Sequence, residues 1–412
     1  MPSILIIAYY FPPWGMGGVQ RLLKFAKYLP EFGWDVTVIA PQPAEYHRQD
    51  PSLLTDLPAS VRIERIPYRD AAQALGPIGP LGPFLRWLSS WRDFPDRHRR
   101  FARLATARAR ELMRERRFDI MLTSSPPPSL HMAGIALRSE LPWIADFRDP
   151  WQALEDDYGP SLVHRIINSG LHKRVLGDAS AVITVTPKLT RRFRSISQAA
   201  RIETIRNGFD EADFDVVVDS TISRDTLKIV LPGTFSRFSD PCPVFAAIAA
   251  SRKSNPVRKL RVIHVGASLG VDVTRMVHDA GLGDVYEDVG YVDHARAIRE
   301  MCDADLLMLA YNDRRVTDLS VPGRVYEALR TLRPLVVFTP DNGALSSLLQ
   351  PLGGCIVIPS MESADSADPI ASALTLPPRS LDSLKQFTRR AQAMALSALC
   401  HEFVEQGREP SR

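Results

Sequence analysis

Val316–Leu349 reads VTDLSVPGRVYEALRTLRPLVVFTPDNGALSSLL and predicts a loop, a helix, a short buried strand and a second loop. Apolar residues from Val325 to Leu332 recur at helical spacing, and Pro334 ends the helix because proline cannot continue it. The run LVVF that follows is short and wholly apolar, as in a strand buried on both faces of a parallel sheet. Helix followed by buried strand indicates an α/β fold.

Two charged residues on this predicted helix form a candidate binding site. Gly323 lets an anionic group approach the free backbone N–H groups of the first turn. Arg324 suits phosphate, and Glu327, three residues later on the same face, can accept hydrogen bonds from the paired hydroxyls of a ribose. The alternative is an exposed ion pair between Arg324 and Glu327 within the helix.

Length and composition narrow the class of protein. A chain of 412 residues favours two domains, and its apolar content of 45% and charged content of 24% are ordinary for globular proteins. The net charge of +4 is small for this length, so the whole chain is not expected to bind polyanions. The four cysteines lie far apart, which predicts neither a zinc site nor disulfides. We expect a cytoplasmic protein, because no apolar run is long enough for a membrane span and the N-terminus does not resemble a signal peptide.

The beginning of the chain predicts a βαβ unit. A strand at Ser3–Tyr10 is followed by a glycine-rich turn, a helix and a second strand at Asp35–Ala40. Open α/β sheets bind ligands at such a turn. The dinucleotide fingerprint requires a glycine where Gln20 stands and an acidic residue after the second strand, so NAD is disfavoured. Gly17 and Gly18 open the helix; the alternative is that they only allow a close helix–strand contact.

A basic stretch follows a loop rich in glycine and proline. Residues 86–117 contain 11 arginines and 4 acidic residues, with Trp87 and Trp91 one helical turn apart. Aromatic groups beside dense arginine suit an anionic bilayer surface, so residues 84–117 are expected to contact the inner membrane. The alternatives are a nucleic acid backbone and a solvated helix that packs on its own domain.

Pro142–Trp151, PWIADFRDPW, predicts a short strand that carries Asp146, Arg148 and Asp149 at its carboxyl end. Buried charges are costly unless paired, so one account is a structural network beneath the loop. The other account is that they face a substrate hydroxyl. Arg148 cannot serve as a base, which makes Asp149 the better candidate. Ser125, in the turn after the preceding strand, either donates to a ligand or caps the next helix.

The second half of the chain repeats the pattern of strand, glycine turn and helix. Thr226–Leu231 is an apolar strand that leads into Gly233 and Arg237. Such a turn presents backbone N–H groups to an anion; the alternative for Arg237 is a plain surface position. Gly343, after the LVVF strand, offers further backbone N–H groups. None of the nine histidines pairs at a metal-ligand spacing, so no bound metal is predicted.

Pro142–Trp151 and Pro322–Leu335 carry a resemblance to family 4 glycosyltransferases, whose fold is the two-domain GT-B arrangement. The first segment resembles a bacterial subgroup with the same DFRDPW run. The resemblance implies that Glu327 holds the ribose of a nucleotide-sugar, while Arg324 and Arg237 meet its diphosphate. It also implies a donor-binding set of Gly17, Gly18, Gly233, Tyr291, Val292, Gly323, Glu327 and Gly343, in which Tyr291 and Val292 lie next to the base.

Three positions depart from the family pattern. An acidic residue is usual eight positions before the ribose-binding glutamate, and Leu319 stands there, next to Asp318. A lysine usually follows the arginine at Arg237, and here Asp240 stands where one would be sought. Related subgroups have a histidine near the register of Arg148. These departures concern the sugar contact, the neutralisation of the diphosphate and the acceptor side.

We therefore predict an α/β GT-B fold of two doubly wound, Rossmann-like domains facing an inter-domain cleft. Residues 1–206 form the acceptor-side domain and 207–384 the nucleotide-sugar-binding domain. GT-B chains often send their last helix, here 385–412, back across to the first domain. The catalytic candidates are Asp149, Arg237 and Arg324, and the acceptor-side candidates are Asp146, Arg148 and Ser125.

The predicted reaction moves a sugar from a nucleoside-diphosphate sugar to a hydroxyl of a glycan or lipid-linked acceptor, in cell-surface polysaccharide synthesis. The resemblance implies retention at the anomeric carbon, with no metal and no cofactor. One alternative is a non-catalytic sugar-nucleotide-binding assembly subunit, suggested by Leu319 and the missing lysine. The other is a nucleic-acid-binding protein that uses the arginine-rich stretch, although the preferred interpretation expects no nucleic acid partner.

Overall fold

The computed structural model describes residues 1–15, 17–43, 49–68, 91, 94–151, 161–197, 201–215, 225–254, 259–359 and 368–406. The chain divides into two compact units. Unit 1 comprises Met1–Arg206 with Arg389–Arg412, and unit 2 comprises Asn207–Thr388. Parts of the predicted basic segment, residues 84–90 and 92–93, lie outside the described residues.

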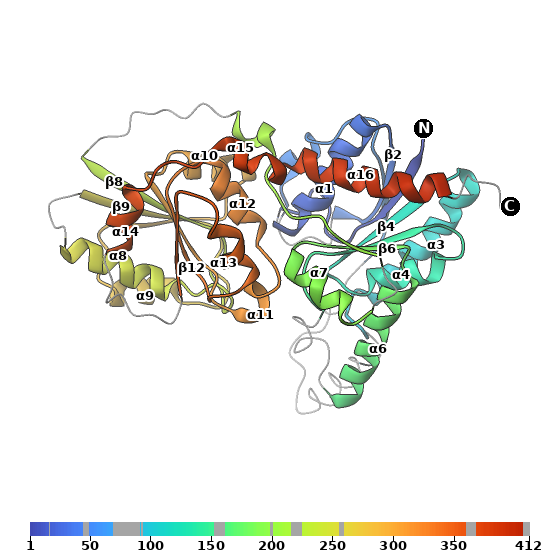
Figure 1. Ribbon diagram of the computed structural model, residues 1–412, viewed down its shortest axis with the longest axis horizontal. Coiled ribbons are helices and arrows are strands. Elements are labelled where there is room, and N and C mark those ends of the chain that lie inside the picture. The colour runs from blue at the N-terminus through green and yellow to red at the C-terminus, as the bar shows by residue number, and fades with distance from the viewer. Residues whose placement is uncertain are drawn as a thin grey trace. The chain divides into compact units, whose positions relative to one another are not determined.

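Unit 1 is built on a seven-stranded parallel sheet with the order β3-β2-β1-β4-β5-β6-β7 (Figure 1). Its central strands are short apolar runs that are buried along their whole length, as expected for a sheet covered on both faces. The bounds are β1 (Ser3–Ile7), β2 (Asp35–Pro41), β3 (Arg62–Ile66), β4 (Ile120–Ser125), β5 (Trp143–Phe147), β6 (Ala181–Thr184) and β7 (Ile202–Thr204).

Two helices of unit 1 begin after residues whose side chains cap them. Ser161 and Thr186 accept hydrogen bonds from the backbone N–H groups of His164 and Leu189, and so cap α6 and α7. The helices are η1 (Gly17–Val19), α1 (Gln20–Tyr28), η2 (Leu29–Phe32), η4 (Pro51–Leu54), α3 (Arg99–Glu115), α4 (Leu130–Leu137), α6 (Leu162–Asp178), α7 (Pro187–Arg194) and α16 (Arg389–Gln406).

The last helix, α16, belongs to unit 1 and lies beside α1 (Figure 1). Ala393, Leu396 and Leu399 are buried in the same core as β1 and α1, and Trp34 Nε1 donates to Ser397 Oγ at 2.9 Å. The preceding residues 385–388 stay with unit 2, where the Phe209 N–H donates to the Phe387 carbonyl. The change of unit therefore falls between Thr388 and Arg389.

Unit 2 contains a six-stranded parallel sheet with the order β10-β9-β8-β11-β12-β13. Its strands are β8 (Thr226–Pro232), β9 (Lys259–Val265), β10 (Tyr286–Gly290), β11 (Leu306–Ala310), β12 (Leu335–Phe338) and β13 (Cys355–Ile358). Its helices are η7 (Glu211–Phe214), α8 (Cys242–Ser254), α9 (Val273–Asp279), α10 (His294–Cys302), α11 (Arg314–Thr317), α12 (Gly323–Arg330), α13 (Ala344–Leu349), α14 (Pro369–Leu374), α15 (Leu381–Leu384) and η8 (Lys385–Phe387).

Both sheets reverse their strand order at the centre, between β1 and β4 in unit 1 and between β8 and β11 in unit 2. Ligands of open α/β sheets bind outside the carboxyl ends of the strands at such a reversal. The predicted α/β class with two parallel sheets is confirmed, and each unit has one position where a site is expected.

Candidate functional site

In unit 1, the charge at the end of β5 is held in a buried ion pair. Arg21 of α1 donates from Nη2 to Asp146 Oδ1 at 2.8 Å and from Nε to both carboxylate oxygens, and both side chains are almost fully buried. Ser124 Oγ donates to Asp146 Oδ2 at 2.7 Å, and Arg21 Nη1 donates to the Arg206 carbonyl. Asp146 therefore ties β5 to α1 and β4, and its carboxylate does not face solvent.

Arg148 is also buried, and its guanidinium binds backbone carbonyls. Nε donates to Ser125 at 3.1 Å, Nη1 to Gly18 and Nη2 to Pro126. A Cβ atom on Gly18 would lie 3.3 Å from Arg148 Nη1 and 3.1 Å from the Trp14 ring, so this position requires glycine for a close approach. Gly17 has no such neighbour. Arg148 thus joins the first glycine turn to the turn after β4, and the buried Ser125 takes part through its carbonyl.

Asp149 differs from its neighbours. It is half-buried, and among the described residues its carboxylate accepts no hydrogen bond. Burial raises the pKa of Asp149, while the positive charge of Arg148 acts in the opposite direction. Of the predicted acidic residues in unit 1, Asp149 is the one with a carboxylate left for a substrate.

Trp151, the last residue of the DFRDPW run, anchors this loop in an aromatic cluster. Its Nε1 donates to Asn168 Oδ1 at 2.8 Å, and its ring stacks on His172 with centroids 5.0 Å apart. Burial lowers the pKa of His172 to about 4 and that of His131, on the other side of the cluster, to about 3. Both rings are therefore neutral near pH 7, which suits packing rather than proton transfer.

In unit 2, Arg324 and Glu327 lie on α12, which links β11 to β12 beside the strand reversal. Arg324 Nη1 and Glu327 Oε2 lie 2.7 Å apart, but neither atom makes a hydrogen bond of acceptable geometry within the described residues. Glu327 is only 7% exposed. Buried polar atoms without hydrogen bonds are costly and rare in folded proteins, so this pair is a candidate for ligand binding.

A second pair of residues approaches Glu327 from α10 and η7. His294 Nε2 lies 3.8 Å from Glu327 Oε1 and 3.1 Å from Asp213 Oδ2. The sequence interpretation missed both residues, because a single histidine at a helix start and an acidic residue far away in the chain carry no local pattern. Their proximity to Glu327 depends on the fold of unit 2.

Tyr311 comes directly after β11 and was also missed, although its place at the end of a buried strand was a usable signal. Burial raises the pKa of Tyr311 to about 12, and the charges of Arg324 and Glu327 both act on it. A Cβ atom on Gly233 would lie 3.6 Å from the Tyr311 hydroxyl. The end of β8, the end of β11 and the start of α12 therefore meet at one place.

The Gly233 turn is held from below by His264 of β9. Gly233 has a φ of +122°, which favours glycine, and a Cβ atom on Gly266 would lie 1.8 Å from the Gly233 carbonyl oxygen. His264 Nε2 lies 3.0 Å from that oxygen, and its Nδ1 lies 3.1 Å from Asp288 Oδ1. The turn predicted to receive an anion is thus rigidly positioned.

The remaining predicted residues of unit 2 occupy varied positions. Arg237 is exposed and lies over the Phe238 ring, with its charge close enough to lower the pKa of Asp313 together with Arg315. Tyr291 is 40% exposed after β10, and Val292 packs against the core. Asp240, where the family has a lysine nearby, accepts from the Cys242 N–H at the start of α8.

Gly343 and Asp318 bring a further loop to this end of the sheet. A Cβ atom on Gly343 would lie 2.8 Å from the Thr317 carbonyl oxygen, and the Ala344 N–H donates to the Asp318 carbonyl. Asp318 Oδ1 is buried and has no hydrogen bond within the described residues; its nearest cation, Arg314 Nη1, is 3.7 Å away. Asp318 therefore supplies a carboxylate next to Leu319, the position at which the family 4 pattern has an acidic residue.

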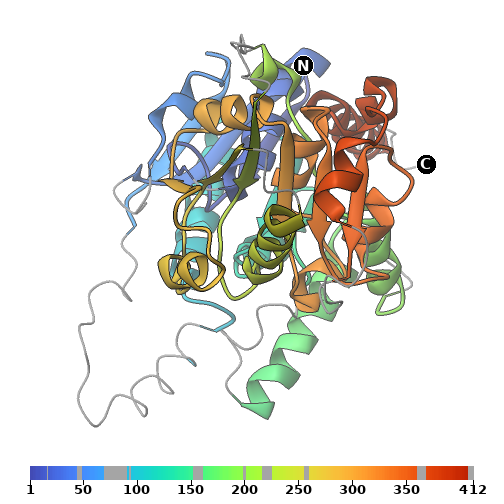
Figure 2. The same ribbon diagram turned by 90° about the vertical axis from the view of Figure 1, so that its left-hand side faces the viewer.

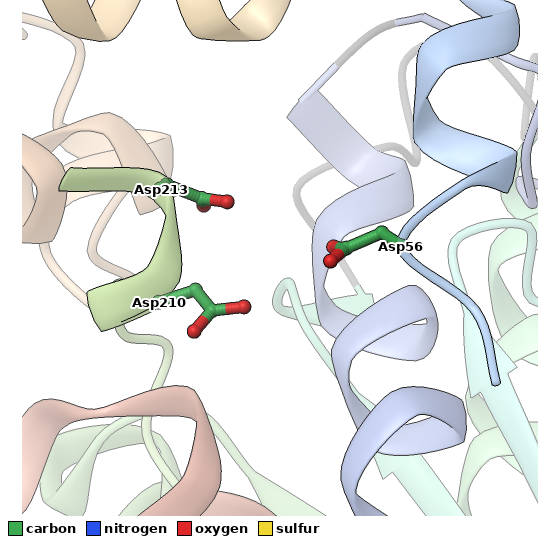
Figure 3. A group of neighbouring side chains, drawn as sticks. All are labelled: Asp56, Asp210 and Asp213. Carbon is green, nitrogen blue, oxygen red and sulfur yellow. The ribbon is translucent and has the colours of Figure 1, made fainter. Parts of the chain in front are cut away.

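Figure 3 shows three more carboxylates, Asp56, Asp210 and Asp213. Asp56 belongs to unit 1, where it accepts from Lys24 and from Lys27, the latter at 2.5 Å. The other two belong to unit 2, where Asp210 caps η7 and Asp213 accepts from His294. Each group is thus engaged inside its own unit, and we do not treat the three as a metal site.

The comparisons with known proteins agree with this fold. Residues 16–208 match a family model described as "Glycosyl transferase 4-like domain". The fold is GT-B, as in sucrose-phosphate synthase from Thermosynechococcus elongatus (15% identity, TM-score 0.58, 99% of each chain). It is also similar to WaaG, a glycosyltransferase involved in lipopolysaccharide biosynthesis (13%, 0.58, 98% of each), and to an E. coli trehalose-6-phosphate protein bound with UDP-2-fluoro glucose (12%, 0.61, 98% of each). None of the curated protein sequences matches the chain.

Proposed function

We propose that this chain, with a glycosyl transferase 4-like domain and a GT-B fold, is a glycosyltransferase that uses a nucleoside-diphosphate sugar. The acceptor is a hydroxyl of a glycan or a lipid-linked sugar in cell-surface polysaccharide synthesis. The observation that carries the proposal is the pair formed by the partly exposed Arg324 and the buried Glu327 beside the strand reversal of unit 2, whose facing atoms have no hydrogen bond within the described residues.

Glu327 would accept hydrogen bonds from the ribose hydroxyls of the donor. Its position is prepared by His294, which also contacts Asp213, so the carboxylate does not need to reorganise when the ligand arrives. The loop after β10, which contains Tyr291 and Val292, would determine which nucleotide base the site accepts.

Arg324 would turn from Glu327 toward the diphosphate, where charge builds up as the sugar leaves. The Gly323 end of α12 adds backbone N–H groups, and the exposed Arg237 adds a second cation. Positioned charges of this kind usually make the largest single contribution to catalysis. In the proposed reaction the leaving phosphate takes the acceptor proton, so neither a metal nor a separate base is needed.

Asp318 replaces the usual acidic residue at Leu319 in this proposal. Its buried Oδ1, without a hydrogen bond within the described residues, would accept from a hydroxyl of the transferred sugar. On the acceptor side, Asp149 would orient the attacking hydroxyl, while Asp146, Arg148 and Ser125 hold the loop that carries it. Retention at the anomeric carbon is part of the proposal.

The first test is thermal stabilisation by UDP, GDP, ADP, CMP and NAD. A ligand at 100 times its dissociation constant adds about 2.7 kcal/mol to the free energy of unfolding. We expect one diphosphate to stabilise the native protein and Glu327→Ala to lose most of that effect. The matched control is Glu287→Ala, which removes an exposed partner of Arg261 on the same unit and should leave the effect intact. Stabilisation by NAD alone, or by none of them, would contradict the proposal.

A second candidate is a sugar-nucleotide-binding assembly subunit without turnover. It is favoured by Leu319 and by Asp240, which caps α8 where a phosphate-binding lysine would be sought. Single-turnover assays distinguish the enzyme from the subunit, with sugar derivatives of whichever nucleotide stabilises the protein as donors. The chain is an enzyme if it transfers the sugar or slowly hydrolyses the donor, and if Asp318→Asn slows that reaction without changing nucleotide binding. Tight nucleotide binding with neither reaction supports the assembly subunit.

A further inference from the structure

Helix α6 presents an apolar surface that the fold of unit 1 does not cover. Leu162, Val163, Ile166 and Ile167 are 64%, 52%, 63% and 45% exposed. Their spacing places all four on one face of the first two turns, and we call them the α6 stripe. The helix itself projects from the other described helices of unit 1 in both views (Figures 1 and 2).

The opposite face of α6 accounts for its attachment to unit 1. His164, Asn168 and His172 are buried, with His164 3.9 Å from the Trp91 ring and Asn168 bound to Trp151. Val175 and Leu176 continue this buried face. The buried face accounts for how the helix is held, and the exposed parts of four large apolar side chains on the other face need another explanation.

Within the described residues, the unpaired charges beside the stripe are positive. Arg165 and Lys173 are exposed, and neither has an ion-pair partner within the described residues. The one acidic residue of α6, Asp178, lies at its far end and pairs with Arg138 and Arg174. Lys173 follows Ile166 by seven residues, about 10 Å along the helix axis and on the same face.

In the described part of the arginine-rich stretch, unlike at Arg165 and Lys173 of α6, several arginines form ion pairs inside unit 1. On α3, Arg108 pairs with Glu64 and Glu111, and Arg110 pairs with Glu140. After α3, Arg116 pairs with Asp35 and Arg117 with Asp119, whereas Arg114 has no ion-pair partner within the described residues. Ion pairs inside unit 1 thus engage at least four of the nine described arginines of residues 84–117, and no large apolar side chain of α3 is exposed.

We propose that the α6 stripe docks unit 1 on an anionic lipid bilayer. The four apolar side chains enter the boundary between headgroups and acyl chains, and Arg165 and Lys173 meet the anionic headgroups. An amphipathic helix lies in the plane of such an interface and buries its apolar face to a depth of about 5–10 Å. No helix in the described part of the chain is long and apolar enough to cross a membrane, so the contact is peripheral. The inference rests on unit 1 alone and does not depend on donor binding by unit 2.

The test is co-sedimentation of the full chain with vesicles of phosphatidylcholine, alone or mixed with equal parts of phosphatidylglycerol. We expect binding to the anionic vesicles. Ile166→Asp and Ile167→Asp should each weaken partitioning about tenfold, because each withdraws roughly two methylene groups from the interface. Lys173→Glu should weaken binding to the anionic vesicles about fivefold or more and leave binding to the neutral ones unchanged.

Two matched variants control for location. Leu269→Asp removes an isolated exposed apolar residue of unit 2 (46% exposed) and should bind like the native chain. Arg114→Glu on the exposed face of α3 should have at most a small effect. The variants lie at the surface, so unchanged melting temperatures exclude misfolding as the cause.

Three outcomes would overturn the proposal. The native chain could fail to sediment with anionic vesicles. Arg114→Glu could abolish vesicle binding while the two isoleucine variants retain it, which would place the membrane contact on α3 instead of α6. Alternatively, analytical ultracentrifugation could show a native dimer that Ile166→Asp dissociates, in which case the stripe is covered by a second copy of the chain.

Discussion

The charged clusters of the two units look alike in sequence and differ in structure. In unit 1, the carboxylate of Asp146 receives hydrogen bonds from Arg21 and Ser124, and Arg148 donates to three backbone carbonyls. In unit 2, Arg324 and Glu327 face each other, yet the nearest atoms make no hydrogen bond within the described residues. The charges of Asp146 and Arg148 thus hold the fold of unit 1 together, whereas the facing atoms of Arg324 and Glu327 in unit 2 have no hydrogen bond within the described residues.

The largest expected effect is on the stability of unit 1. Asp146→Ala leaves the buried guanidinium of Arg21 without its carboxylate, and breaking a buried pair from one side costs about 3–5 kcal/mol. Urea denaturation should show this loss. The control Asp35→Ala removes a partly exposed partner of Arg116 and should cost less than about 1 kcal/mol. Equal losses of unfolding free energy in the two variants would contradict the expectation that the buried ion pair contributes more than the surface pair.

Acidification should weaken unit 1 next. Burial lowers the pKa of His98 and His131 to about 3 and that of His172 to about 4. The folded state then binds fewer protons than the unfolded chain below the ordinary histidine pKa of about 6.5, so stability is full above that pH and falls below it. Asp96, whose pKa burial raises to about 6, acts in the opposite direction because its folded form takes up a proton first.

The net loss between pH 7 and about pH 5.5 is on the order of 3 kcal/mol. Hydrogen exchange followed by mass spectrometry can assign it, since peptides from the strands of unit 1 should exchange faster at the lower pH. Replacing His131 by glutamine should remove about a third of the change. Peptides of unit 2 that lose protection first would show that the buried histidines of unit 1 do not control acid stability.

A smaller effect on folding, and a clear one on binding, is expected at Glu327. Glu327→Gln keeps the shape of the side chain and removes the charge of a buried carboxylate whose partner, Arg324, is partly exposed, so it should lower the stability of the unliganded protein by less than Asp146→Ala does. Diphosphate stabilisation in the thermal assay should fall by more than the unliganded stability does. The reverse ranking, with a large folding defect and intact binding, would make the pair structural like that of unit 1.

The smallest effect is expected at Asp149. Because burial raises its pKa, the ionised form opposes folding, and this cost appears as the pH rises through the folded pKa. Asp149→Asn should therefore leave stability unchanged at low pH and increase it slightly at pH 8, as thermal unfolding at both pH values would show. A loss of stability at pH 8 would mean that the ionised carboxylate has a structural partner.

The outline of the fold followed from local patterns. Apolar runs such as Ser3–Ile7 and Leu335–Phe338 predicted buried parallel strands, and glycine turns marked where they end. The structure divides the chain after Arg206 and again after Thr388. Such signals are readable in sequence because they depend on neighbouring residues.

The contacts within the candidate sites could not be predicted from local sequence patterns. Tyr311, His294 and Asp213 approach Arg324 or Glu327 only when three separate segments of unit 2 fold together. The predicted membrane contact in residues 84–117 did not anticipate the ion pairs of α3, nor the exposed face of α6. The partners of a side chain depend on segments that are remote in sequence.

The sequence by itself determined the α/β class, a helix that carries Arg324 and Glu327, and a short strand within Pro142–Trp151 with charged residues at its carboxyl end. Only the tertiary structure decided which of those charges are satisfied. Arg21 and Asp146 are 125 residues apart in the chain, and their pairing exists because β1, β4 and β5 lie side by side in one sheet. Burial and hydrogen bonding are properties of that arrangement, so they distinguish a structural charge from a binding one where residue type cannot.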